Sequence, residues 1–144
     1  MNLSVLTLVN NNPARDIRRI TFIGRSPSAE EALLLEKAFH GSNIQKQNVL
    51  DANYNHREQD LAADIFRDFE THSGHNTAYA LFSTETRNSG CIVAAKTCDN
   101  LGAPLILIQH HHNGTLDCVE IFVHNERYVI SNAHLMAMGG GSAA

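Results

Sequence analysis

The chain has 144 residues, the size of a single domain, and carries 11 Lys and Arg against 15 Asp and Glu, a net charge of −4. No run of Lys or Arg exceeds the pair Arg18 and Arg19, so the basic surface by which proteins bind nucleic acid is not visible. No apolar run approaches the roughly 20 residues of a membrane-spanning helix. We therefore expect neither nucleic acid nor a membrane as a partner.

The cysteines and the amino terminus indicate the compartment. Cys91, Cys98 and Cys118 are an odd number without paired spacing, which favours a reducing compartment over a disulfide framework. We interpret them as small buried side chains. The first nine residues lack the basic flank and the small-residue cleavage site of a secretory signal. We expect a cytoplasmic protein, in a cell or in a virus-infected host.

The first half of the chain alternates strands with a helix. A short apolar strand is expected at 5–9 and a second strand at 17–23, and a helix follows at 28–39. A strand at 44–50 is weakly indicated, because four of its residues are polar. The residues expected on the inner side of the helix are Leu33, Leu34, Leu35, Ala38 and Phe39.

The second half begins with an amphipathic helix at 57–69, whose two sides differ in polarity. Its apolar residues Leu61, Ile65, Phe66 and Phe69 are expected to face the core, opposite Asp60, Asp64 and Asp68. A strand at 77–82, a helix at 89–101 and a strand at 104–108 then have the spacing of a βαβ crossover. Strands at 116–123 and 127–131 are expected to form a hairpin.

The alternation from residue 17 to residue 108 predicts an α/β domain over 1–137. We expect a three-layer sandwich with a mostly parallel sheet and a C-terminal antiparallel hairpin. The hairpin also leaves open an α+β, ferredoxin-like sheet. Residues 138–144 are interpreted as a flexible tail. Because the strands are short and the core thin, we expect a homo-oligomer.

Polar residues follow the predicted parallel strands, whose carboxyl ends meet at one edge of the sheet. Arg25 and Ser26, which we predict to bind a ligand, follow Gly24 at the end of the strand at 17–23, and Ser28 and Glu31 have the spacing of a capping box. The amino terminus of the following helix, with Arg25 beside it, could bind an anion. Simple helix capping is the alternative interpretation of this turn.

The strand at 77–82 leads into a second turn that contains an arginine and hydroxyl groups. The residues predicted to bind a ligand here are Arg87, Asn88, Ser89 and Gly90. If both turns converge, they would hold a phosphate, a carboxylate or a ribose. A few well-placed arginines are enough to bind a small anionic ligand.

Two residues at strand ends are candidates for chemistry. Glu85 lies just past a strand, where a general base or nucleophile would sit, and His110 follows the strand at 104–108. His110, His111 and His112 could instead be solvated loop residues, or bind a metal with His124, Asp117 or Glu120. Since no established metal-ligand spacing is present, we predict neither a metal nor a cofactor.

Four short segments in this half, which together span about a third of the chain, have the order of motifs seen in a known protein family. They are Glu58-Gln59-Asp60-Leu61, Asn88-Ser89-Gly90, Ala94-Ala95 and Leu101-Gly102-Ala103-Pro104. This part resembles the nucleoside 2-deoxyribosyltransferase and nucleotide N-glycosidase family, which implies a nucleoside or nucleotide ligand and cleavage of an N-glycosidic bond. The family's nucleophilic glutamate falls at Ala94. Either Glu85 or Glu70 substitutes for it, or the pocket binds without cleaving.

A second resemblance rests on Val93-Ala94-Ala95-Lys96-Thr97-Cys98, Leu105-Ile106-Leu107-Ile108 and the segment 117–122. These look like the helix, strand and hairpin of the phage S-adenosylmethionine lyases. That resemblance implies an α+β trimer with sites between subunits and with glutamates in place of a metal. A third possibility, a nucleotide-binding or nucleotide-sequestering protein without turnover, is favoured by Ala94.

Overall fold

The structure is a computed structural model, and it describes residues 2–3, 17–39, 49–50, 58–72, 76–83, 88–123 and 126–133. The expected strand at 5–9, the first part of the expected strand at 44–50 and the tail at 138–144 lie outside these residues. No helix in the described ranges is long and apolar enough to cross a membrane.

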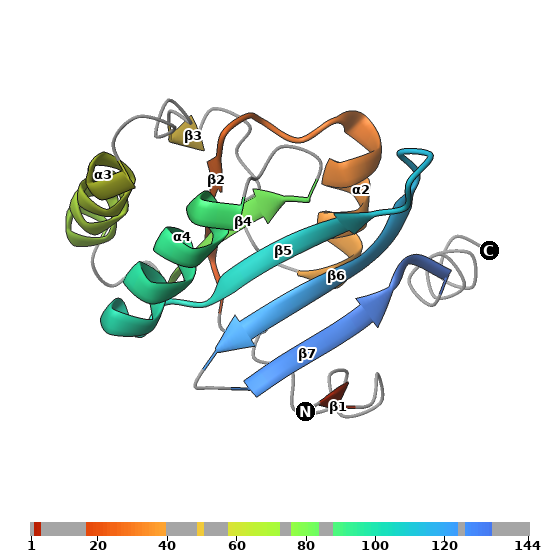
Figure 1. The fold of residues 1–144 in the computed structure, drawn as a ribbon. Coiled ribbons are helices and arrows are strands. Elements are labelled where there is room, and N and C mark those ends of the chain that lie inside the picture. Colours follow the sequence, from red (N-terminus) through yellow and green to blue (C-terminus); the bar gives the residue numbers. More distant parts are fainter. Residues whose placement is uncertain are drawn as a thin grey trace.

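Strands and helices alternate along the described chain, which confirms the α/β class (Figure 1). The elements are β1 (Asn2–Leu3), β2 (Arg19–Ile23), α2 (Ala29–Ala38), β3 (Val49–Leu50), α3 (Glu58–Thr71), β4 (Thr77–Phe82), α4 (Asn88–Leu101), β5 (Leu105–His110), β6 (Leu116–Val123) and β7 (Glu126–Ser131).

These strands form one mixed sheet in the order β1-β7-β6-β5-β4-β2-β3. The pairs β3–β2, β2–β4 and β4–β5 are parallel. The pairs β5–β6 and β6–β7 are antiparallel, and β1 runs parallel to β7. The carboxyl ends of β2, β4 and β5 therefore point toward the same edge of the sheet.

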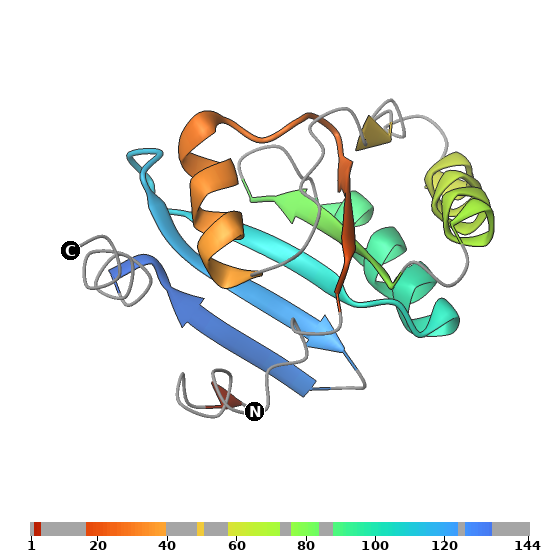
Figure 2. The same ribbon diagram turned by 180° about the vertical axis from the view of Figure 1, so that it is seen from behind.

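The helices divide between the two faces of the sheet. Helix α2 packs on one face, which Figure 2 shows toward the viewer, whereas α3 and α4 lie on the other face near β2, β4 and β5 (Figure 1). All six residues of β4 are buried, because this strand lies between β2 and β5 with helices on both sides. The side chains of β4 that face α2 are Ala78, Ala80 and Phe82, and those that face α3 and α4 include Tyr79 and Leu81.

Helix α2 begins where the sequence predicts. The Ser28 side chain accepts a hydrogen bond from the Glu31 backbone, and the Glu31 side chain accepts one from the Ser28 backbone, so the capping box is complete. The predicted inner side is correct for Leu34, Leu35, Ala38 and Phe39 and wrong for Leu33, which is 48% exposed. At about 100° per residue, position 33 lies well away from the side shared by the buried positions.

Helix α3 is rotated relative to the sequence prediction. Leu61 and Ile65 are buried as expected, but Phe66 is 49% exposed. Asp68, expected on the outer side, has a side chain only 11% exposed. Positions 61, 65 and 68 lie on one side of a helix, and the sheet supplies hydrogen-bond donors for the carboxylate at that point.

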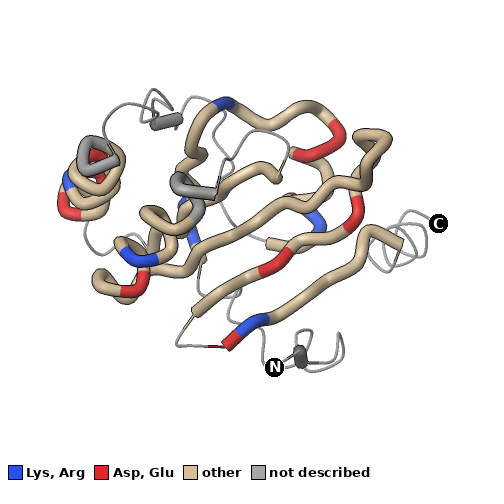
Figure 3. The backbone as a smooth tube through the Cα atoms, viewed as in Figure 1, with Lys and Arg blue, Asp and Glu red and all other residues tan. Residues whose placement is uncertain are grey.

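Lys and Arg residues in the described ranges are distributed over several elements, from β2 and α2 to α3, α4 and β7, with Asp and Glu among them (Figure 3). Residues of both charge signs therefore occur on α2, α3, α4 and β7 (Figure 3). The carboxyl edge of the sheet carries one such opposite-charge pair, which belongs to the candidate site.

Candidate functional site

The topology singles out the carboxyl ends of β2 and β4, which are neighbouring parallel strands. After β2 the chain passes through α2 to β3 on one side, whereas after β4 it passes through α4 to β5 on the other. The two helices lie on opposite faces of the sheet (Figures 1 and 2). In open α/β sheets a reversal of strand order of this kind is a common place for ligands. Here the segment from β2 to α2 crosses the end of β4, where Arg25 lies over the Phe82 ring.

Arg25 connects the ends of β2 and β4. It follows Gly24, whose φ of 104° is a conformation open to glycine. Its guanidinium donates two hydrogen bonds to Glu31, Nη1 to Oε1 at 2.7 Å and Nη2 to Oε2 at 2.9 Å. The same group lies 3.9 Å from the centre of the Phe82 ring, at the end of β4. The predicted ligand-binding arginine is thus held by a carboxylate of the protein itself.

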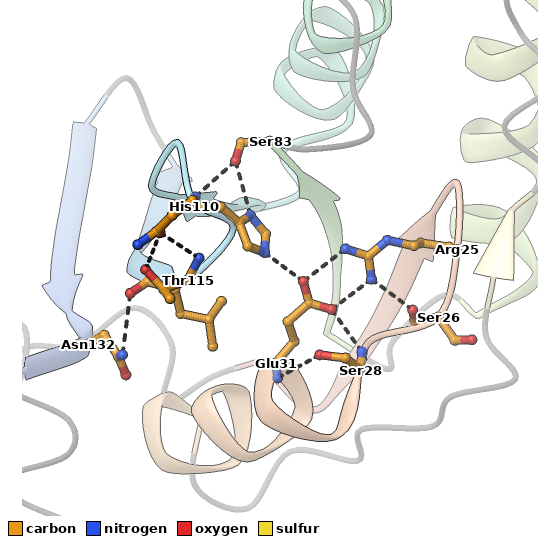
Figure 4. A network of polar contacts seen from close by, with 10 residues as sticks. Arg25, Ser26, Ser28, Glu31, Ser83, His110, Thr115 and Asn132 are labelled. Carbon is orange, nitrogen blue, oxygen red and sulfur yellow. Dashed lines mark hydrogen bonds and ion pairs between the residues drawn. The ribbon is translucent and has the colours of Figure 1, made fainter.

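Glu31 is the centre of the polar network in Figure 4. Its side chain, 4% exposed, contacts Arg25, the Ser28 backbone N–H and His110. Burial on its own raises the pKa of this carboxyl, but the hydrogen bonds from those three groups outweigh burial and lower the pKa from 4.5 to about 2. Glu31 is therefore ionised at neutral pH and accepts every hydrogen bond that it makes.

His110, at the end of β5, joins Glu31 to the end of β4. Its Nε2 lies 2.7 Å from Glu31 Oε2, and its Nδ1 lies 3.1 Å from Ser83 Oγ. The His110 backbone N–H also donates to Ser83 Oγ, at 2.9 Å. The imidazole side chain is 5% exposed, so both ring nitrogens are used inside the protein.

The structure brings some of the predicted site residues together. Arg25 and His110 meet through Glu31, and Ser26 is exposed beside them, with its carbonyl accepting from Arg25 at 3.2 Å. The predicted residues Glu85 and Arg87 lie outside the described ranges. Asn88, Ser89 and Gly90 form the first turn of α4, and their side chains are not described.

Sequence reasoning identified Glu31 as a cap but missed its contact with His110, and it did not assign any role to Ser83. The capping-box spacing is local and visible in the sequence, whereas Glu31 and His110 are 79 positions apart. The sequence position of Ser83, directly after β4, could have indicated a role, because Arg25 and His110 are predicted site residues for the same reason: each lies at a strand end.

A second polar cluster, also missed, lies between α3 and the sheet. Asp68 accepts hydrogen bonds from Arg19 at 3.0 and 3.2 Å, from Thr21 at 3.1 Å and from the Tyr79 hydroxyl at 2.7 Å. Burial raises the pKa of the Asp68 carboxyl, and the bonds from Arg19 and Tyr79 more than offset this, so that the pKa is lowered. With four donors on one carboxylate, this cluster fixes α3 against β2 and β4.

The histidines around the β5–β6 turn do not gather with other ligands. Among the described residues, no group of three or more His, Cys, Asp or Glu side chains could hold a metal ion. His111 lies 3.6 Å from Asp117, and both side chains are half exposed. Glu120 is bound by Gln109 and Arg127 on the neighbouring strands.

Position 94 lies in the core and not at the carboxyl edge. Ala94 is fully buried on the inner side of α4, packed with Leu61, Ile65 and Cys98. Burial also raises the pKa of the Cys98 thiol to about 12. A carboxylate at position 94 would therefore be in an apolar environment, away from Arg25 and His110.

Comparisons with protein-family models, with curated proteins and with solved structures found no match to this chain.

Proposed function

We propose that the protein binds a nucleoside or a nucleotide at the carboxyl edge of the sheet, beside the ends of β2 and β4. In this proposal the domain is a three-layer sandwich closed by the C-terminal hairpin, and it works in the cytoplasm as a homo-oligomer. The observation that carries the proposal is the switch point between β2 and β4, with Arg25 at one strand end and Ser83 at the other.

The charges favour the turn before α4 as the place for an anionic group. The first turn of α2 contains Glu30 and Glu31, and Glu31 already forms a salt bridge with the Arg25 guanidinium. The first turn of α4 contains no acidic residue. A helix amino terminus attracts an anion, so we assign the phosphate of a nucleotide to Arg87, Asn88, Ser89 and Gly90, where Arg87 would also balance the charge of Glu85 two positions earlier.

Binding, and not cleavage, is the part of the proposal with the stronger support. Ala94 lies in the core, and His110 holds Glu31 and Ser83 with its two ring nitrogens. His110 therefore positions other groups and has no nitrogen left for a ligand. If an N-glycosidic bond is cleaved, Glu85 is our candidate for the base or nucleophile.

The test measures binding first and turnover second. Thermal unfolding and calorimetry with nucleosides, nucleoside monophosphates and S-adenosylmethionine should give a shift and a dissociation constant for at least one nucleoside-containing compound. Separation of the products then distinguishes the activities. Free base indicates a glycosidase, methylthioadenosine with homoserine lactone indicates a lyase, and a shift without product indicates a binder. The absence of any shift or product contradicts the proposal.

Arg87→Ala should weaken binding of a nucleotide by about 1.5–3 kcal/mol if a charge-assisted pair with the phosphate is lost. The matched control is Arg67→Ala, which removes an exposed arginine from α3. An equal loss in both variants, or none in either, would show that the turn before α4 does not hold the phosphate.

A further inference from the structure

Ser83, His110 and Glu31 form a chain of hydrogen bonds, and the charge of Glu31 determines which group donates in each of them. Glu31 is ionised and can only accept, so His110 must donate from Nε2 across the 2.7 Å contact. In a neutral imidazole the other nitrogen, Nδ1, then has a lone pair and no hydrogen. When His110 is neutral, the donor across the 3.1 Å contact is therefore the Ser83 hydroxyl.

The same oxygen also receives a hydrogen bond. The backbone N–H of His110 donates to Ser83 Oγ at 2.9 Å, which uses one of the two lone pairs of the hydroxyl. The single hydrogen and one lone pair are thus engaged inside the network. Ser83 is partly exposed at the end of β4, and what it can offer to a neighbouring molecule is one lone pair.

We infer that Ser83 acts as a hydrogen-bond acceptor for a hydroxyl of the ligand's sugar, with Glu31 and His110 as the residues that set its direction. This inference rests on the proposed nucleoside site and adds which part of the ligand lies beside β4. An ionised phosphate oxygen only accepts hydrogen bonds, so it would be repelled by the remaining lone pair of Ser83 and could not form a hydrogen bond with it. A ribose hydroxyl can donate, so the sugar lies against Ser83 and the phosphate lies nearer to the turn before α4.

Serine, histidine and carboxylate in this order could also activate a nucleophile. Two contacts oppose that role here. Arg25 compensates the charge of Glu31 with two hydrogen bonds, which weakens its effect on the imidazole. The N–H of His110 withdraws electron density from Ser83 Oγ. Both contacts suit an oxygen that is held in place as an acceptor.

The experiment compares wild type and Ser83→Ala for binding of a ribonucleoside and of its 2′-deoxy and 3′-deoxy analogues, at pH 8, where an ordinary histidine is neutral. Loss of one of the two sugar hydroxyls should weaken binding to wild type by about 3- to 10-fold, the usual range for one hydrogen bond. The same loss should leave binding to Ser83→Ala unchanged within about 2-fold. Thr71→Ala, which removes an exposed hydroxyl from the end of α3, should discriminate as wild type does.

A second pair of variants tests the direction of the hydroxyl. His110→Gln can still donate to Glu31 but offers no acceptor at the position of Nδ1, so Ser83 would be free to rotate and the discrimination should fall. His110→Asn retains an oxygen near the position of Nδ1 and should preserve more of the discrimination between the ribonucleoside and its deoxy analogues. Ser83→Cys, which keeps the shape of the side chain with a larger atom that accepts hydrogen bonds weakly, replaces Ser83→Ala if that variant does not fold.

The outcomes separate the inference from the proposed function. If no nucleoside binds wild type, the proposed function fails and the inference fails with it. If nucleosides bind but the deoxy analogues lose the same affinity in wild type and Ser83→Ala, only the inference fails. Covalent labelling of Ser83 by a fluorophosphonate would also overturn it, because the oxygen would then be a nucleophile and not a fixed acceptor.

Discussion

Replacement of Glu31 by Gln should destabilise the fold at neutral pH and have progressively less effect in acid. The pKa of Glu31 is lowered from 4.5 to about 2, and at about 1.4 kcal/mol per pKa unit this difference corresponds to about 3 kcal/mol of unfolding free energy. Because the folded-state pKa is the lower one, this stabilisation is complete above about pH 4.5 and is lost as the pH falls through about 2. About half of it should remain near pH 3.3.

The measurement is urea-induced unfolding of wild type and Glu31→Gln from pH 7 to pH 3, with the difference in unfolding free energy plotted against pH. Other carboxylates titrate in both proteins and cancel in this difference. Glu36→Gln is the matched control, since Glu36 is exposed on the same helix and its loss should cost less than about 0.5 kcal/mol. A difference that is small at pH 7, or that stays constant down to pH 3, would refute the electrostatic account of this network.

Two further variants test the packing of the helices. Asp68→Asn should lower the unfolding free energy by about 3 kcal/mol, because it removes the charge that pairs with Arg19 in a largely buried site, whereas Asp64→Asn on the same helix should have little effect; similar urea midpoints for the two would contradict the cluster. Leu35→Ala should cost about 2–5 kcal/mol, and Leu33→Ala less than about 0.5 kcal/mol, in thermal or urea unfolding, because Leu35 is buried and Leu33 is half exposed. The reverse order would show that α2 is rotated.

The features that the sequence predicts well are those set by neighbouring residues. The start of α2 follows from Ser28 and Glu31, three positions apart, and the βαβ crossover follows from apolar runs whose spacing leaves room for one helix. The carboxyl-edge location of Arg25 and His110 follows from the predicted parallel pairing of their strands, because the carboxyl ends of parallel strands lie on one side of the sheet. These predictions need no knowledge of which helix covers which face.

The features that the sequence does not reveal depend on contacts between distant segments. On α3, the choice between Phe66 and Asp68 for the inner side is decided by Arg19 and Thr21 of β2 and by Tyr79 of β4. Local polarity favours burial of the phenylalanine, but hydrogen bonds offset the cost of burying the aspartate. The pattern of polar and apolar residues along α3 contains no information about hydrogen-bond donors on β2 and β4, so it cannot predict that Asp68 is buried.

The pairing of Arg25 with Glu31 also changes what the first arginine-bearing turn can do. An arginine at a helix amino terminus predicts an anion site, yet here the anion is the protein's own Glu31 side chain, held by two short hydrogen bonds. An external anion would have to displace a carboxylate whose pKa is about 2, which is unfavourable. The network is therefore better suited to fixing Ser83 and the strand ends than to binding a phosphate, which is why our proposal assigns the phosphate of a ligand to Arg87 and the start of α4. If Arg25→Ala and Arg87→Ala reduced nucleotide affinity equally in folded protein, this division between the two turns would be wrong.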